Sequence, residues 1–278
     1  MVMTADTCIG FIGAGNMAEA LVRGLIAART ALPERILIYD VSAPRCEQLH
    51  GELGVTAVAG NRELVGRAGV VMLAVKPQNL ADVLADVKGL ARPEQLFVSI
   101  LAGVGTERLE EGLAHDGCPS PHVVRVMPNT PALLQEGASA LTGGRYATQE
   151  DLALARTFFE TVGKTEIVEG DQMDAITGLT GSGPAYVFRM IEAMIEAGVA
   201  LGLPREKAEV LVKQTVYGAA LMARDGAESP AELRRRVTSP GGTTAAGLKA
   251  MDEQGFSEIV IGAVQAAAKR SEELGRAS

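Results

Sequence analysis

Up to about residue 168 the sequence alternates short apolar runs with amphipathic segments, and this alternation limits the possible folds more than any other feature. Strands are expected at residues 8–12, 36–39, 69–75, 96–100, 122–126, 137–142 and 165–168. Helical periodicity falls between them, near residues 16–29, 43–53, 78–87, 105–114 and 148–162. Buried strands that alternate with helices predict an α/β fold, with a doubly wound parallel sheet covered by helices on both faces.

The pattern changes after residue 168. From Asp171 onward Ala, Met and Leu recur at helical spacing, and helices are expected at 171–201, 204–225, 229–237, 243–253 and 256–274. We therefore predict two domains, a sheet domain of residues 1–167 and an all-helical domain of residues 168–278. Two arrangements of the helical domain remain open: its apolar side chains pack on a second subunit, or they pack only on its own sheet domain.

A glycine-rich segment, GFIGAGNMA at residues 10–18, joins the first strand to the first helix. It fits the pattern GxGxxA with Gly13, Gly15 and Ala18. Gly13 permits a tight turn, Gly15 lets a pyrophosphate approach the backbone, and the small Ala18 lets the helix pack closely on the strand. A diphosphate would then lie on free amides at the helix N-terminus. In this strand–turn–helix context the segment predicts a Rossmann-type domain that binds a dinucleotide.

Asp40 closes the second strand, where a carboxylate accepts hydrogen bonds from the adenosine ribose of NAD. The same charge would repel the 2′-phosphate of NADP, although Arg45 could pair with that phosphate. We therefore predict NAD(P)H as the cofactor, with a lean towards NADH.

Three further segments follow strands, at the edge of the sheet where ligands bind. Lys76, in the run Ala74-Val75-Lys76-Pro77, could lie against the cofactor or be an ordinary exposed lysine. Ala102-Gly103 offers bare backbone to the nicotinamide side. Asn129, between two prolines, carries an amide that could orient cofactor or substrate.

The helical domain contains no histidine, and residues 171–201 contain no lysine. Hydride transfer to a ketone normally needs such an acid beside the carbonyl. A cyclic imine carries its own proton near neutral pH, so an enzyme that reduces one needs mainly positioning, a dry pocket and an anchor for the substrate. The sequence thus favours an imine over a hydroxy acid as the substrate.

Two segments could anchor a substrate carboxylate through backbone amides and hydroxyls. One contains Ser182 in a glycine–serine turn within the helical stretch, and the other is TSPGGTT at residues 238–244, which opens a helix at Thr243. The structural alternatives are a helix kink and an interhelix loop.

The formal net charge of −8 argues against nucleic-acid binding, because a basic face is needed to neutralise phosphates. The three cysteines and three histidines show no metal-ligand spacing, so no metal site is expected. Neither a secretory signal nor a membrane-spanning run is evident, which favours a cytoplasmic protein.

Five motifs, GFIGAGNMA, LAVKPQ, MPNTP, LTGSGPAY and TSPGGTT, make the chain resemble the pyrroline-5-carboxylate reductase family from end to end. The resemblance implies an oxidoreductase that reduces 1-pyrroline-5-carboxylate to L-proline with NADPH or NADH, the last step of proline biosynthesis. It also implies a helical dimerisation domain whose helices interleave with those of a second subunit, giving a homodimer or a ring of dimers.

The resemblance also assigns residues. It implies cofactor contacts at Gly13, Ala14, Gly15, Asn16, Met17, Asn61, Ala74, Lys76, Pro77, Ala102 and Gly103. The substrate carboxylate would meet Gly242, Thr243 and Thr244, and Thr244 would also donate a hydrogen bond to the ring nitrogen, as the catalytic residue. Asp40 departs from the small polar residue of many members, and this departure disfavours NADPH.

Two other functions are compatible with parts of the sequence. A related Rossmann-type reductase would act on a hydroxy acid or another imine, and the missing lysine and histidine weigh against the hydroxy acid. A non-enzymatic NAD(P) sensor would not need a second polar site such as TSPGGTT.

Overall fold

The computed structural model describes residues 7–277. The chain forms two compact units. The first contains the chain up to Ser182 together with the chain from Ala266 onward, and the second is Gly183–Gln265. The predicted division between residues 167 and 168 follows sequence pattern rather than contacts, and it stays a prediction.

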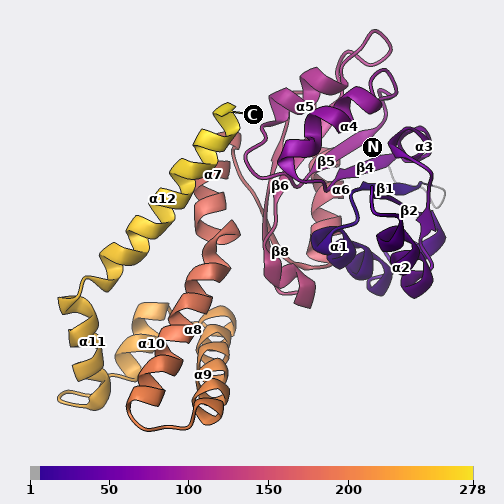
Figure 1. The fold of residues 1–278 in the computed structure, drawn as a ribbon. Helices are drawn as coiled ribbons and strands as arrows, with labels where there is room; N and C mark the ends of the chain where they lie inside the picture. The colour runs from indigo at the N-terminus through magenta and orange to yellow at the C-terminus, as the bar shows by residue number, and fades with distance from the viewer. Residues whose placement is uncertain (1–6, 278) are drawn as a thin grey trace. The chain divides into compact units, whose positions relative to one another are not determined.

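An eight-stranded sheet forms the centre of the first unit, in the order β3-β2-β1-β4-β5-β6-β7-β8 (Figure 1). From β3 to β6 all neighbouring strands are parallel. The strand order reverses between β1 and β4, and in open α/β sheets ligands bind beyond the carboxyl ends of the strands at such a reversal. The predicted Rossmann-type sheet is thereby confirmed. The strands are β1 (Ile9–Ile12), β2 (Ile36–Tyr39), β3 (Thr56–Ala57), β4 (Val70–Leu73), β5 (Leu96–Ser99), β6 (His122–Met127), β7 (Gly137–Gly143) and β8 (Gly163–Ile167).

The last two strands depart from the expected parallel sheet. β7 is antiparallel to β6, and β8 is parallel to β7. The expected parallel sheet therefore runs from β3 to β6, and its continuation through β7 and β8 begins with an antiparallel pair. The reason is the short connection of residues 128–136, because a parallel crossover needs about a dozen residues or more.

Helices cover both faces of the sheet (Figure 1). One face carries α1 (Asn16–Ala27), α2 (Ala43–Leu53) and α6 (Gln149–Glu160), which bury Leu21, Leu49 and Phe158 in one apolar cluster. The other carries α3 (Asn61–Arg67), α4 (Leu80–Asp86) and α5 (Thr106–Leu113), which bury Leu64, Val83 and Leu109 in a second cluster. The short helices η1 (Pro33–Arg35), η2 (Pro77–Asn79) and η3 (Thr130–Leu134) complete the connections. Two buried faces explain why the strands are apolar throughout rather than alternating.

Sequence reasoning missed β3 and α3. β3 has two residues, and α3 has seven, of which Leu64 and Val65 are buried. Neither element is long enough to show a periodicity.

The helix expected at 171–201 is not continuous, and that prediction is wrong in detail. It divides into η4 (Gly170–Gln172), α7 (Met173–Ile176), a π-helical turn η5 (Thr177–Gly181) and α8 (Gly183–Ala200). The π-helical turn also replaces the expected glycine–serine turn. A Cβ built on Gly181 would lie 2.5 Å from the Cε atom at the end of the Met127 side chain, so this segment packs against the last residue of β6.

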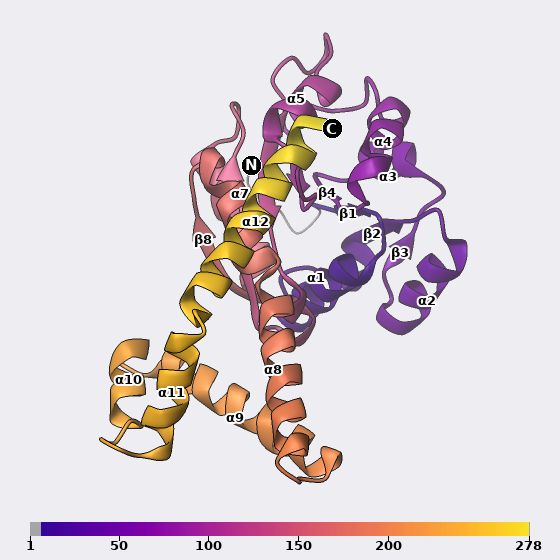
Figure 2. The same cartoon turned by 60° about the vertical axis from the view of Figure 1, so that its left-hand side comes forward.

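The second unit is helical. It contains α8, α9 (Arg205–Asp225), α10 (Pro230–Arg236), α11 (Thr243–Glu253) and the beginning of α12 (Phe256–Ala277) (Figure 2). Gly202, with φ +92°, lies in the left-handed region and connects α8 to α9. The four helices expected after residue 203 are confirmed.

Few apolar side chains are buried within this unit. Between Gly183 and Gln265 the buried ones are Ile195 and Ala208, whereas Phe188 is 58% exposed and Ile259 65% exposed. A helical unit without a core of its own is typical of a subunit interface.

Candidate functional site

The glycine-rich turn joins β1 to α1 at the reversal of strand order. Gly13 has φ +98°, and a Cβ built on it would lie 2.7 Å from the carbonyl oxygen of Ala74, at the end of β4. Any other residue at this position would therefore have a strained backbone, and its Cβ would overlap the backbone of Ala74. Ala18 is buried, so its small side chain lets α1 approach the sheet.

The N-terminus of α1 is open. Gly15 is its N-cap, no side chain caps the helix, and a Cβ on Gly15 would meet no heavy atom within 4 Å. Asn16 is exposed and Met17 is half-buried. Free backbone N–H groups and the positive end of the helix dipole favour an anion here. The backbone therefore fits the diphosphate of a dinucleotide.

The carboxylate of Asp40 lies beside this turn. Its Oδ2 accepts the N–H of Ala14 at 2.8 Å, and its Oδ1 accepts the N–H of Ser42 at 2.9 Å. The Nε of Arg45 donates to the carbonyl oxygen of Ala14 at 2.8 Å. Asp40 and Arg45 thus hold the two sides of one residue of the glycine-rich turn.

Glu19 is a residue of this region that sequence reasoning missed. Its carboxylate pairs with the guanidinium of Arg45 and, at 2.7 Å, with that of Arg23. The hydrogen bond from Arg45 is the main reason that the pKa of Glu19 lies below its usual value, against the opposing effect of burial. The sequence left open that Arg45 could pair with a 2′-phosphate, and the structure pairs it with Glu19. The sequence feature that could have indicated Glu19 is its place as an acidic residue in the first turn of α1.

Other predicted cofactor residues lie around the carboxyl edge of the sheet. Ala74 is half-buried, and Lys76 and Pro77 are exposed, with Lys76 as the N-cap of η2. Asn61 donates from Nδ2 to Asp86 at 3.0 Å, while its buried Oδ1 has no hydrogen-bond partner among the described residues. The contacts of these residues with a cofactor stay predictions.

Ala102 and Gly103 follow β5. Gly103 is buried with φ +71°, and a Cβ on it would lie 3.1 Å from the Cβ of Leu274 in α12. The end of α12 therefore covers part of the backbone that was expected to be bare. The same stretch of α12 is tied down by Ser271, whose Oγ donates to Oδ1 of Asp174 at 2.6 Å.

Asn129 joins two of the motifs. Its Nδ2 donates to the carbonyl oxygen of Thr180 at 3.1 Å, and its Oδ1 accepts the N–H of Ala138 at 2.8 Å. Both polar atoms of the Asn129 amide, which was predicted to orient cofactor or substrate, therefore bond to backbone groups of the protein. Ser182 is half-buried and closes the π-helical turn through its N–H, which donates to the carbonyl oxygen of Thr177. Tertiary structure places Asn129 beside η5, 51 residues further on.

The expected substrate segment opens α11 in the helical unit. Gly241 has φ +71°, and Gly242 is the N-cap, with no side chain capping the helix. A Cβ on Gly242 would lie 2.4 Å from the Oγ of Ser239 and 3.1 Å from its carbonyl oxygen, so the turn is tight and Ser239 would have to move for a larger residue. Thr243 and Thr244 are exposed in the first turn. Free amides with two adjacent hydroxyls suit a small carboxylate.

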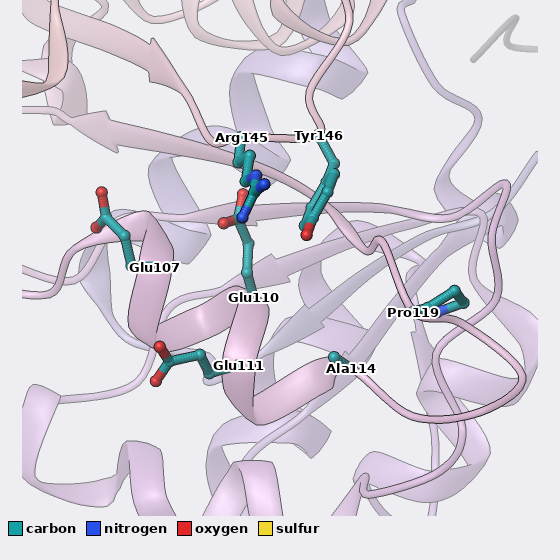
Figure 3. Close-up of a pocket in the computed structure, with 7 residues that line it drawn as sticks. All are labelled: Glu107, Glu110, Glu111, Ala114, Pro119, Arg145 and Tyr146. Carbon is teal, nitrogen blue, oxygen red and sulfur yellow. The ribbon is translucent and has the colours of Figure 1, made fainter.

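A separate pocket of about 330 Å³ lies along α5 (Figure 3). Burial raises the pKa of Glu110, although hydrogen bonds from the backbone of Arg145 and Tyr146 oppose this. None of the predicted site residues lines it. Three of the seven lining residues are glutamates, and the full set is Glu107, Glu110, Glu111, Ala114, Pro119, Arg145 and Tyr146.

Two further properties of the described residues bear on function. Across residues 7–277 no group of three or more His, Cys, Asp or Glu side chains is arranged to hold a metal ion. Within the same range, no helix is both long and apolar enough to cross a membrane.

Comparison with known proteins extends this picture. A sequence profile described as NADP oxidoreductase, coenzyme F420-dependent, matches residues 8–103, and one described as pyrroline-5-carboxylate reductase dimerisation matches residues 170–274. The chain is 43% identical to the pyrroline-5-carboxylate reductase of Synechocystis, over 96% of this chain and 98% of that protein.

Solved structures agree. A pyrroline-5-carboxylate reductase from Coxiella burnetii superimposes with a TM-score of 0.90 at 38% identity, covering 97% of this chain and 98% of the other. The pyrroline carboxylate reductase of Plasmodium falciparum, solved with NADP bound, gives a TM-score of 0.86 at 31% identity, over 98% and 100% of the two chains.

The Rossmann-type sheet, the open glycine-rich turn and the helical region define an NAD(P)-dependent oxidoreductase. Within that class, similarity over nearly the whole of both chains decides the family. The chain belongs to the pyrroline-5-carboxylate reductase family.

Proposed function

We propose that this protein reduces 1-pyrroline-5-carboxylate to L-proline with NAD(P)H, the last step of proline biosynthesis. The observation that supports this most strongly is the 43% identity, over 96% of the chain, to a relative that bears this name. When bound, the dihydronicotinamide supplies a hydride to the imine carbon. The ring nitrogen keeps the proton that it already carries as an iminium, so the balanced products are proline and oxidised coenzyme.

The residues of the glycine-rich turn would hold the coenzyme. Free amides at Gly15, Asn16 and Met17 lie at the uncapped N-terminus of α1 and would receive the diphosphate. Asp40 would accept hydrogen bonds from the adenosine ribose, because each of its oxygens accepts one backbone N–H and retains a further lone pair. The carboxylate also favours NADH, since it would repel a 2′-phosphate.

The residues that open α11 would hold the substrate. The amides of Gly242 and Thr243 would receive the carboxylate. The hydroxyl of Thr244 would accept the N–H of the iminium, donate to the lone pair that the ring nitrogen gains on reduction, or hold a water there. Ser182 would contribute from the end of the π-helical turn, a geometry that is frequent at functional sites. Positioning of this kind suits an imine, because no strong acid is required for the transfer.

The helical unit would form a homodimer, alone or as part of a ring of dimers. Its exposed apolar side chains, among them Phe188 at 58% and Val210 at 68%, support burial against a second copy. We further propose a cytoplasmic enzyme that needs no metal ion.

The deciding experiment measures absorbance at 340 nm with the purified protein, pyrroline-5-carboxylate and each coenzyme in turn. We expect oxidation of the coenzyme that depends on the imine, with proline as the product. A 2-hydroxy acid and a 3-hydroxy acid, each supplied with oxidised coenzyme, are the matched controls. Brisk turnover of either hydroxy acid without activity on the imine would contradict the proposal.

A further inference from the structure

The guanidinium of Arg45 has protein partners at all three nitrogens. Nε donates to the carbonyl oxygen of Ala14 at 2.8 Å, Nη1 donates to Oε1 of Gln48 at 2.9 Å, and Nη2 pairs with the carboxylate of Glu19. The side chains of Arg45 and Glu19 are 22% and 21% exposed, so water screens this pair less than a surface pair.

Arg45 lies next to the glycine-rich turn, because its guanidinium hydrogen-bonds to Ala14. Asp40, which follows β2, hydrogen-bonds to the same residue. In Rossmann-type domains the end of β2 faces the adenosine ribose, and an arginine nearby accommodates the 2′-phosphate of NADP. Here that arginine is already neutralised by a carboxylate.

Glu19 is itself held in place. Arg23 pairs with it at 2.7 Å, and Arg23 in turn pairs with Glu52 at 2.5 Å. Glu52 also accepts from Nε2 of Gln48 at 2.8 Å. The four side chains around Arg45 therefore form one network anchored on α1 and α2, and releasing Arg45 requires breaking its bond to Glu19.

We propose that Glu19 is a specificity-determining residue for the coenzyme: by holding Arg45, it denies a charge partner to a 2′-phosphate and favours NADH over NADPH. This inference rests on the proposed binding of NAD(P)H. It differs from a role of Asp40, because Asp40 acts by repulsion whereas Glu19 acts by occupying the arginine that hydrogen-bonds to this turn.

The test is the dissociation constant of each reduced coenzyme, measured by fluorescence titration without substrate, for Glu19→Gln and Glu19→Ala. We expect the dissociation constant of NADPH to fall roughly tenfold, because a freed arginine makes a charge-assisted bond to phosphate. That of NADH should change by less than about twofold. Two variants are used because a glutamine could still accept weakly from Arg45.

The matched control is Glu52→Gln, which removes the same charge from the same network but leaves the bond between Glu19 and Arg45. We expect no change in the ratio of the two dissociation constants. In addition, Arg45→Gln introduced into the Glu19→Ala background should abolish the gain for NADPH.

An unchanged ratio in both Glu19 variants, with unchanged unfolding temperature, would overturn the inference. An equal gain in Glu52→Gln would also overturn it, since the effect would then be one of general charge. Coenzyme binding to the unaltered protein separates the two proposals. If neither NADH nor NADPH binds, the proposed function fails as well. If either binds while the ratio stays unchanged in the Glu19 variants, only the role of Glu19 is refuted.

Discussion

A Cβ on Gly13 would lie 2.7 Å from the carbonyl oxygen of Ala74, while Gly15, two residues on, has no heavy atom within 4 Å of the corresponding point. The two glycines of this motif therefore have different structural roles. Gly13 is required by the fold, since its backbone has φ +98° and packs on the end of β4. Gly15 is not required by packing, and the open space around it leaves the N-terminus of α1 accessible to a ligand.

This difference predicts opposite outcomes for the two alanine substitutions. Gly13→Ala should lower the free energy of unfolding by at least roughly 1–3 kcal/mol, the cost of backbone strain alone. Gly15→Ala should leave stability nearly unchanged and weaken binding of NADH, because its methyl group would fill the space needed by the diphosphate. Thermal unfolding and coenzyme titration of both variants check this. Equal loss of stability in both would contradict the assignment.

Asp40→Ser should raise the kcat/KM ratio of NADPH to NADH by roughly ten- to a hundredfold, since one close charge repulsion amounts to about 1–3 kcal/mol. The bond from the N–H of Ala14 to Asp40 adds a second effect. Loss of this acceptor should raise KM for both coenzymes. Asp40→Asn is the matched variant, because it removes the charge and keeps an acceptor. A ratio that stays constant in both variants would show that the carboxylate does not face the ribose.

Thr244→Ala should lower kcat/KM for pyrroline-5-carboxylate by roughly ten- to a hundredfold, since a hydrogen bond to a charged group contributes about 1.5–3 kcal/mol. Binding of NADH should barely change, and Thr244→Ser should recover most of the activity because it keeps the hydroxyl. Steady-state kinetics with a coenzyme titration provides the measurement. Near-normal kcat/KM in a folded Thr244→Ala variant would contradict this assignment, and the substrate contact would then have to come from Ser182 or from backbone amides alone.

Phe188→Glu should shift the protein towards a monomer, because this side chain is 58% exposed on a helical unit that buries little of its own apolar surface. Light scattering at micromolar concentration measures the mass. Leu32→Glu is the control, since Leu32 is 59% exposed but lies in the sheet unit. A compact monomer for the unaltered protein, or the same shift in both variants, would refute assembly through the helices.

The carboxylate of Asp151 makes the free energy of unfolding depend on pH in the acidic range. Burial tends to raise its pKa, but hydrogen bonds from the backbone N–H of Thr148 and from His122, at 2.6 Å, outweigh this and hold it below its ordinary value of 3.8. A depressed pKa contributes stability that is complete above 3.8 and is lost as the pH falls through the folded-state pKa. Asp151→Asn should therefore cost about 1–3 kcal/mol near neutral pH and progressively less below pH of about 4. A difference in unfolding temperature that is constant from pH 7 to about 3 would contradict this account.

Much of the fold could be read from the residues alone. The apolar runs of β1, β2, β4, β5 and β6 were evident because strands buried on both faces are apolar throughout, and a run of this kind is visible without any partner. The glycine-rich turn was evident for a similar reason, since the requirement at Gly13 is a backbone conformation that only glycine adopts readily. The long helices after residue 203 showed their periodicity over many turns.

Contacts between distant segments were not readable, because nothing local specifies them. The bond between Asn129 and Thr180 and the pairing of Glu19 with Arg45 each join residues 26 or more apart, through the approach of separate elements. The reversed direction of β7 and the π-helical turn at Thr177–Gly181 depend on how a short connection and a close approach to Met127 are accommodated. The sequence by itself thus determined the glycine-rich turn between β1 and α1, from which a dinucleotide site is predicted, because backbone freedom and strand patterning are local properties. Only the tertiary structure decided which charges face each other beside that turn, since this depends on the packing of α1 against α2.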